Sequence, residues 1–250
     1  MSLSSQFAAL FSGNDIYLAM AAALVAGLLR GFAGFGSAML MAPLFAILFG
    51  SAEMIATIVA MEIAISFHLF PAARRHCDWS VVAPMTVAAC LAMPLGLWLL
   101  VSLDRVAITK LVSAIVAGFA LILLTGWRWR GLRGWVPSAV VGTISGAMMA
   151  TTSVGGPPVL LYIMSSDDSP TTVRANVITY YFATQILLLG IMFAGGVAGP
   201  VALLRAVILF PFMLAGSWAG VRFFHGASEL FYRRVALGLL LAVGLFGLLH

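Results

Sequence analysis

The sequence predicts an all-α integral membrane protein built from two inverted repeats, each a broken-helix hairpin followed by three transmembrane helices. Three observations predict this fold class: the apolar composition, a series of apolar segments of membrane-spanning length, and two glycine clusters at corresponding points of the two halves. The predicted divisions are an N-terminal segment over 1–14, a first repeat over 15–126 and a second repeat over 127–250, all in one membrane domain.

The composition excludes an ordinary soluble domain. Of the 250 residues, 63% are hydrophobic and 8% are charged, whereas soluble domains carry about 25% charged residues. The net charge of +5 comes from Lys and Arg residues at the ends of apolar segments, so we assign it to membrane topology and not to nucleic-acid binding. We expect a multi-pass protein of the cell inner (plasma) membrane.

The N-terminus and the cysteines carry no processing or metal signal. Segment 1–14 has no basic residue ahead of its apolar residues and no clear cleavage motif, so we expect the first helix to direct insertion. Cys77 and Cys90 have no metal-ligand partners around them in the sequence, so we predict neither a metal site nor a disulfide framework, and no cofactor.

Six apolar segments have the length of a single membrane crossing, which takes about 20 residues. Two further segments are about 35 residues long, and a straight helix of that length would extend about 52 Å. Each contains a helix-breaking cluster near its middle, so we interpret each as two short helices joined by a turn. In chain order, the predicted elements are the broken segment 15–49, the spans 51–73, 79–101 and 105–126, the broken segment 133–166, and the spans 171–194, 201–221 and 230–249.

The two halves share one layout, in which a broken segment precedes three spans. A shift of 119 residues places Gly36 on Gly155 and Ser37 on Gly156. Secondary transporters often contain such repeats, with the substrate site at the repeat interface on discontinuous helices. The layout therefore favours transport.

The distribution of Lys and Arg favours inverted repeats. If each broken segment crosses once, six basic residues fall on each side, with Arg30 left out because it lies inside a segment. If each segment turns back as a hairpin, nine fall on one side and three on the other, as the positive-inside rule prefers, and both termini lie outside. The larger set is Arg74, Arg75, Arg128, Arg130, Arg133, Arg174, Arg222, Arg233 and Arg234.

The two hairpin tips are the candidate substrate site. The second helix of each hairpin begins with free N–H groups and a partial positive charge, which favour an anion. Glycines let a ligand approach the backbone, and hydroxyls donate hydrogen bonds; the alternative is that these small residues only permit tight helix packing. The candidates are Gly34, Gly36 and Ser37 at the first tip and Thr152, Ser153, Gly155 and Gly156 at the second.

Glu62 is the candidate for proton coupling. It lies at the centre of the span 51–73, where an ionised carboxylate costs about 2.5–3.5 kcal/mol or more and usually faces a cavity or a proton path. The alternative is a protonated carboxyl that bonds a neighbouring helix. Ser66 lies one turn further on the same face, and the repeat mates of Glu62 and Ser66 are Tyr181 and Gln185, of which Gln185 is a further site candidate.

Arg30 and Asn176 complete the candidate site. Arg30 directly precedes the first glycine cluster and either attracts an anion or extends toward the inner headgroups. Arg174 and Asn176 open the span 171–194, where we assign Arg174 to the loop boundary and expect Asn176, deeper in the span, to reach the cavity.

Two motifs resemble those of a known family. The segment GFAGFGSAMLMAP from Gly31 to Pro43 and the segment SVGGPPVLLY from Ser153 to Tyr162 are similar to the paired glycine motifs of the sulfite exporter TauE/SafE family, as is the Arg-Ala-Asn that ends at Asn176. Ser37 and Ala38 stand where the family often has further glycines. The resemblance implies a transporter that exports small sulfur anions such as sulfite, sulfoacetate or other sulfonates, coupled to ion gradients.

The predicted partners are a small anionic substrate and the lipid bilayer, with a homodimer left open. The alternative functions are a channel and a membrane-embedded enzyme acting on a small anion. An enzyme would need a cluster of catalytic or metal-binding residues at membrane depth, and Glu62 has no acidic partner within a span, so we expect no enzymatic activity. Saturable, gradient-dependent flux would separate a transporter from a channel.

Overall fold

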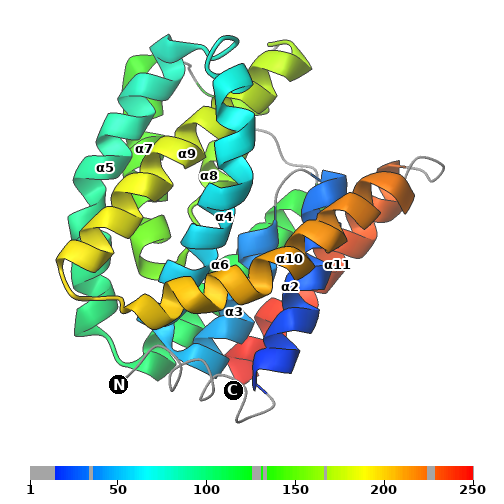
Figure 1. Ribbon diagram of the computed structural model, residues 1–250. Helices are drawn as coiled ribbons and strands as arrows, with labels where there is room; N and C mark the ends of the chain where they lie inside the picture. The colour runs from blue at the N-terminus through cyan, green and yellow to red at the C-terminus, as the bar shows by residue number, and fades with distance from the viewer. Residues whose placement is uncertain are drawn as a thin grey trace.

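The computed structural model describes residues 15–33, 36–125, 131, 134–165, 168–223 and 229–249. The described residues fold into α-helices joined by short turns, and none of them lies in a strand. Figure 1 shows α5 and α7 on one side, α2 and α11 on the other, and α4 and α9 between them. The helices are α2 (Asp15–Ala33), α3 (Ser37–Phe49), α4 (Ser51–Ala73), α5 (Trp79–Ser102), α6 (Arg105–Leu124), α7 (Trp135–Thr152), α8 (Gly156–Ile163), α9 (Pro170–Ala194), α10 (Pro200–Phe223) and α11 (Glu229–Leu249).

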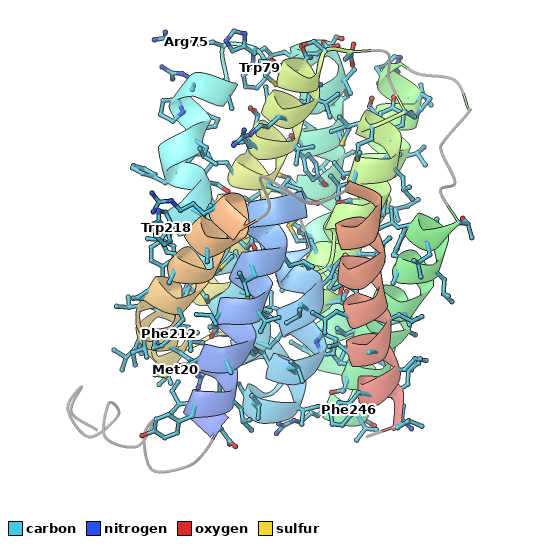
Figure 2. The ribbon with its side chains drawn as sticks, turned by 90° about the vertical axis from the view of Figure 1, so that its right-hand side faces the viewer. Met20, Arg75, Trp79, Phe212, Trp218 and Phe246 are labelled. Atoms are coloured by element: carbon cyan, nitrogen blue, oxygen red, sulfur yellow. The ribbon has the colours of Figure 1, made fainter. Side chains whose placement is uncertain are left out.

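The chain is an all-helical membrane protein. Within the part of the chain that the structure describes, four helical segments are long and apolar enough to cross a bilayer: Trp79–Ser102, Arg105–Leu124, Thr171–Ala194 and Pro200–Gly220. Large apolar side chains such as Leu91, Trp98 and Trp218 are more than half exposed, and Figure 2 shows Trp218 on the outer face of α10. In a bilayer these side chains contact lipid.

The molecule has two distinct ends. Figure 2 shows Arg75 and Trp79 at one end and Met20 and Phe246 at the other. Because α4 runs from Ser51 to Ala73, just before Arg75, it begins at the Phe246 end and finishes at the Arg75 end. Position along α4 therefore measures depth in the bundle.

Both predicted helix breaks occur. The first hairpin turns at Gly36, which caps α3 with φ 94°, and the second turns between Ser153, with φ 62°, and Gly155. The arms are unequal, because α2 and α7 contain 19 and 18 residues whereas α3 contains 13 and α8 only 8. At 1.5 Å per residue α8 extends about 12 Å, too short to cross a membrane.

Glycine faces bring two helix pairs into close contact, α5 with α7 and α2 with α10. A Cβ atom added to Gly146 of α7 would lie 2.2 Å from the carbonyl oxygen of Ala89 of α5, and one added to Gly27 of α2 would lie 2.1 Å from that of Met213 of α10. Gly27 and Gly146 each lie in the longer helix of a hairpin and face a span of the other half of the chain. Small residues allow helix backbones in a membrane to approach this closely.

Several other contacts join the two halves of the chain. Helix α4 packs on α9 and α6 packs on α11, while α4 also contacts α10 and α9 also contacts α5. The C-terminal end of α3 is held by Arg105, which donates from Nε to the carbonyl oxygen of Ala46 at 3.2 Å and from Nη2 to that of Ile47. A cation at this position adds a donor to the last carbonyl groups of α3 and lies at the negative end of the helix dipole.

Candidate functional site

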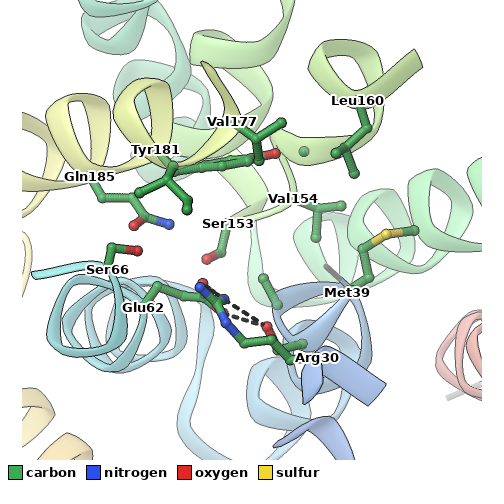
Figure 3. A pocket seen from close by; sticks show the side chains of 15 residues that line it. Arg30, Met39, Glu62, Ser66, Ser153, Val154, Leu160, Val177, Tyr181 and Gln185 are labelled. Atoms are coloured by element: carbon green, nitrogen blue, oxygen red, sulfur yellow. Dashed lines mark hydrogen bonds and ion pairs between the residues drawn. The ribbon is translucent and has the colours of Figure 1, made fainter. Parts of the chain in front are cut away.

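A cavity of about 70 Å³ lies where the two hairpin tips meet α4 and α9. It is at mid-depth, since Glu62 stands near the middle of α4. Figure 3 shows the side chains around it. The lining residues are Arg30, Gly36, Ser37, Ala38, Met39, Glu62, Ser66, Ser153, Val154, Gly156, Leu160, Val177, Ile178, Tyr181 and Gln185.

Three polar side chains from three helices are bonded together on one wall of this cavity. The Arg30 Nη1 group donates to Glu62 Oε2, forming an ion pair, and also to Ser37 Oγ at 3.2 Å. The Ser37 hydroxyl donates to Glu62 Oε1 at 2.5 Å. The side chains of Arg30 and Glu62 are 17% and 6% exposed. Arg30 therefore reaches into the bundle, and its cation and the Glu62 carboxylate neutralise one another there.

The N-terminus of α3 is part of the same wall. The left-handed conformation of Gly36 lets the chain reverse directly before Ser37, the first residue of α3. The N–H groups in the first turn of a helix have no acceptor within the helix, and the helix dipole makes this end positive. The Glu62 carboxylate, bonded to Ser37, lies where such an end attracts an anion.

The second tip offers fewer donors. Two of the first three residues of α8, Pro157 and Pro158, have no N–H group, which leaves Gly156 as the one backbone donor of those three. Gly156 also gives room to the Tyr181 side chain, because an added Cβ atom would lie 2.5 Å from the Tyr181 hydroxyl oxygen. The hydroxyl of Ser153 is the other polar group that this tip presents to the cavity.

The polar pair on α4 and its repeat mates on α9 line the cavity together, as Figure 3 shows for Glu62, Ser66, Tyr181 and Gln185. Gln185 is 5% exposed, and its side-chain oxygen has no hydrogen-bond partner among the described residues. An amide oxygen without a partner in a polar cavity is available to a water molecule, a protonated group or a ligand.

Two candidates at the second tip lie behind the cavity wall. The Thr152 hydroxyl donates to the Met148 carbonyl oxygen at 2.7 Å, within α7. The Gly155 carbonyl oxygen accepts from Ser145 Oγ at 2.5 Å, and a Cβ atom on Gly155 would lie 2.6 Å from the Ser145 carbonyl oxygen. The Tyr180 hydroxyl donates to Ser145 Oγ at 2.8 Å. These contacts hold the tip in place, so Gly155 is needed here for close packing.

Asn176 lies away from the cavity, and Gly34 lies outside the described residues. Asn176 is fully buried and accepts from the Asp78 N–H at 2.7 Å, which ties α9 to the turn between α4 and α5. In the same turn, burial raises the pKa of the Cys77 thiol above its ordinary value, with the nearby Asp78 carboxylate adding to the shift. The thiol therefore stays neutral at physiological pH.

The structure adds cavity residues that sequence reasoning did not assign. Tyr181 was identified only as the repeat mate of Glu62, and Ile178 was not singled out. The spacing of residues 174, 178, 181 and 185 places them on one face of a helix. The position of Gln185 on this face of α9 could therefore have indicated Tyr181 and Ile178 as cavity residues. The ion pair between Arg30 and Glu62 had no sequence signal, because the two residues are 32 positions apart on different helices.

Comparison with known proteins gives one match. The family model described as Sulfite exporter TauE/SafE matches residues 19–247. No curated protein and no solved structure matches the chain. The matched region contains both hairpin tips and every residue that lines the cavity.

Proposed function

Because the chain belongs to the sulfite exporter TauE/SafE family, we propose that it is a secondary transporter that exports a small sulfur-containing anion, such as sulfite, sulfoacetate or another organosulfonate. It acts as a multi-pass protein of the cell inner membrane, with the Arg75 end in the cytoplasm as the positive-inside rule prefers. The observation that carries the proposal is the mid-depth cavity in which a buried cation, two serine hydroxyls and a helix N-terminus converge.

The donors of the cavity suit an oxyanion. Arg30 and the Ser37 and Ser153 hydroxyls, together with the first-turn N–H groups of α3, can each donate to a sulfite or sulfonate oxygen. The volume of about 70 Å³ has room for a few water molecules. A sulfite ion or a sulfonate head group matches this space better than a bulky anion does.

Glu62 couples the anion to a proton. Its carboxylate occupies the donors of Arg30 and Ser37, so an incoming anion must compete with it. Two negative charges at one small buried site repel one another, whereas a protonated Glu62 releases both donors to the substrate. The charged and titratable groups that line the cavity with Glu62 are Arg30 from α2 and Tyr181 from α9. Substrate binding therefore strengthens as the pH falls.

Alternating access arises from two inverted repeats, α2 to α6 and α7 to α11. In this arrangement each helix of α2 to α6 corresponds to the helix five places later in α7 to α11. The helix contacts support it, because the contact of α5 with α7 has its counterpart in that of α10 with α2, and the contact of α4 with α10 has its counterpart in that of α9 with α5. The contacts of α4 with α9 and of α6 with α11 each join a helix to its own counterpart. The cavity takes residues from equivalent elements of both repeats. Rocking of the repeats about such a shared site would expose it to either side in turn.

Binding is tested first by thermal unfolding of the purified protein with sulfoacetate, whose sulfonate stays ionised across the pH range used. At a concentration a hundredfold above Kd we expect the melting temperature to rise by about 5–10 °C. Because the proposal has Glu62 take up a proton together with the anion, the rise should increase as the pH is lowered for the wild type and should not change with pH for Glu62→Gln. Ser37→Ala should reduce the rise, whereas Ser113→Ala, which removes a buried hydroxyl that does not line the cavity, should not.

Transport is then measured as sulfoacetate flux into proteoliposomes under an imposed pH gradient. We expect saturable flux driven by the gradient in the wild type, and loss of that drive in Glu62→Gln. The proposal is wrong if no sulfite or sulfonate stabilises or crosses with the wild-type protein. Equal losses in Ser37→Ala and Ser113→Ala would place the binding site elsewhere.

A further inference from the structure

We propose that a second anion site, in the groove between the end of α4 and the start of α9, receives the substrate before it reaches the central cavity, with Arg174 as the attracting group. The inference rests on the proposed function, because the ligand class, a small sulfur oxyanion, is the same. The proposal gives Arg174 a role in substrate access, whereas its position at the boundary of a span suggests only a role at the membrane interface.

The groove has a volume of about 370 Å³ and lies at the Arg75 end. Ile178 lines both the groove and the central cavity. Arg174, Ile178, Tyr181 and Gln185 follow one another at helical spacing on one face of α9, so this face leads from the groove to the cavity. The groove is lined by Leu69, Ala72, Ala73, His76, Thr171, Arg174, Ala175 and Ile178.

Among the described residues, the Arg174 cation in the groove has no carboxylate partner. Arg174 is exposed and forms no ion pair with any described residue, and no Asp or Glu is among the lining residues. The nearby Asp78 carboxylate is engaged at the start of α5, where it accepts from the Ser80 N–H and hydroxyl. An unpaired guanidinium at the mouth of a concave site raises the local concentration of anions and matches the oxygens of a sulfonate.

At the opposite end of the bundle, contacts between charged and polar groups join the start of α4 to α10. Glu53, at the start of α4, accepts from Arg205 Nη1 at 3.2 Å and from the Gly199 N–H at 3.1 Å. The Arg205 guanidinium also lies 4.0 Å from the ring centre of Phe49. Arg205 is 7% exposed, so this cluster is packed shut. In this conformation the groove is the side from which an anion approaches the cavity.

The experiment compares sulfoacetate flux from the groove side in Arg174→Gln, Arg174→Lys and Arg75→Gln proteoliposomes. Arg75 is an exposed arginine at the same end that does not line the groove, so its variant controls for the general surface potential. We expect Arg174→Gln to raise KM by about three- to tenfold at low salt with the maximal rate retained. Arg174→Lys should keep most of the wild-type KM, and Arg75→Gln should stay close to it.

Salt separates a charge effect from a structural one, because screening weakens an exposed charge at high ionic strength. The ratio of KM between Arg174→Gln and the wild type should therefore shrink as salt is added. The groove site is overturned if Arg174→Gln and Arg75→Gln behave alike, or if Arg174→Gln lowers only the maximal rate. If the folded wild-type protein shows no saturable sulfoacetate flux, the proposed transport function is wrong. That result is read from the wild type alone and does not depend on the Arg174 variants.

Discussion

Ser153 combines an unfavourable backbone conformation with a position in the cavity wall. Among the described residues it is the one non-glycine residue with a positive φ. The left-handed conformation costs a residue with a side chain about 1–2 kcal/mol, and glycine adopts it without that cost. The hydroxyl faces the cavity and is 7% exposed. A serine at this position is consistent with a hydroxyl that contacts the anion.

Two substitutions of Ser153, by glycine and by alanine, separate the effect of its hydroxyl on binding from the effect of its backbone strain on stability. Ser153→Gly should raise the melting temperature of the unliganded protein by about 2–4 °C, because relief of strain outweighs the extra chain entropy by about 1 kcal/mol. Ser153→Ala should not raise it. Both should reduce the additional stabilisation by sulfoacetate, measured by thermal unfolding. A full sulfoacetate effect in Ser153→Gly would show that the hydroxyl does not contact the ligand.

At the residue scale, the sequence identified which charges are unusual but not how they pair. Arg30 and Glu62 stand out because charged residues are costly inside a span. Their contact depends on the angle at which the first hairpin returns toward α4, which no local pattern specifies. Gly155 shows the same limit, because glycine serves ligand approach and helix packing equally well, and its contact with Ser145 appears only in three dimensions.

At the element scale, glycines bring two helix pairs into direct backbone contact. Gly142 and Gly146 place α7 directly against the carbonyl groups of α5, and Gly216 and Gly220 place α10 against those of α2. Each pair joins a hairpin of one half to a span of the other. The hairpin and its partner span are therefore expected to move together when the site changes sides.

A methyl group in one of these interfaces should destabilise the fold. Gly146→Ala forces Cβ into the Ala89 carbonyl group of α5, and overpacking of this kind costs about 1–3 kcal/mol. Gly190→Ala is the matched control, because nothing lies within 4 Å of a Cβ atom at that helical position. Thermal unfolding should show a lower melting temperature for Gly146→Ala and no loss for Gly190→Ala. Equal effects in both would mean that the α5–α7 contact is not close.

Most helix boundaries could be predicted from apolar length and from turn residues. The span predicted over 51–73 is α4 to the residue, and the other five begin or end within two residues of the observed helices. The unequal arms of the hairpins could not be predicted in this way. The shortness of α8 follows from where Ser153 and Gly155 stop α7, and that point is fixed by contacts with Ser145 and Tyr180 on other turns and helices.

On the scale of the whole molecule, the two ends differ in closure. The Phe246 end is joined by the pair of Glu53 and Arg205, whereas the Arg75 end contains the groove. In the proposed alternating-access cycle, the pair opens on one side as the groove closes on the other.

Weakening the closed end should slow the cycle without removing the substrate site. Glu53→Gln leaves Arg205 without its carboxylate, so we expect a lower maximal flux of sulfoacetate in proteoliposomes and an unchanged stabilisation by sulfoacetate in thermal unfolding. Asp15→Asn, an exposed carboxylate at the start of α2 at the same end, is the control and should leave both unchanged. An unaltered maximal flux in Glu53→Gln would show that this pair does not limit the cycle.

In the proposed proton-coupled mechanism, the pair of Arg30 and Glu62 also determines how transport responds to voltage. With the site empty, the guanidinium and the carboxylate cancel. With a proton on Glu62 and a singly charged anion beside Arg30, the site is again neutral. Moving one net charge across the membrane costs about 2.3 kcal/mol per 100 mV. Neither the empty site nor the site with the anion and proton bound carries a net charge. Export of a monovalent sulfonate is then electroneutral and follows the proton and substrate gradients alone, whereas a divalent anion would leave one negative charge for the membrane potential to drive outward.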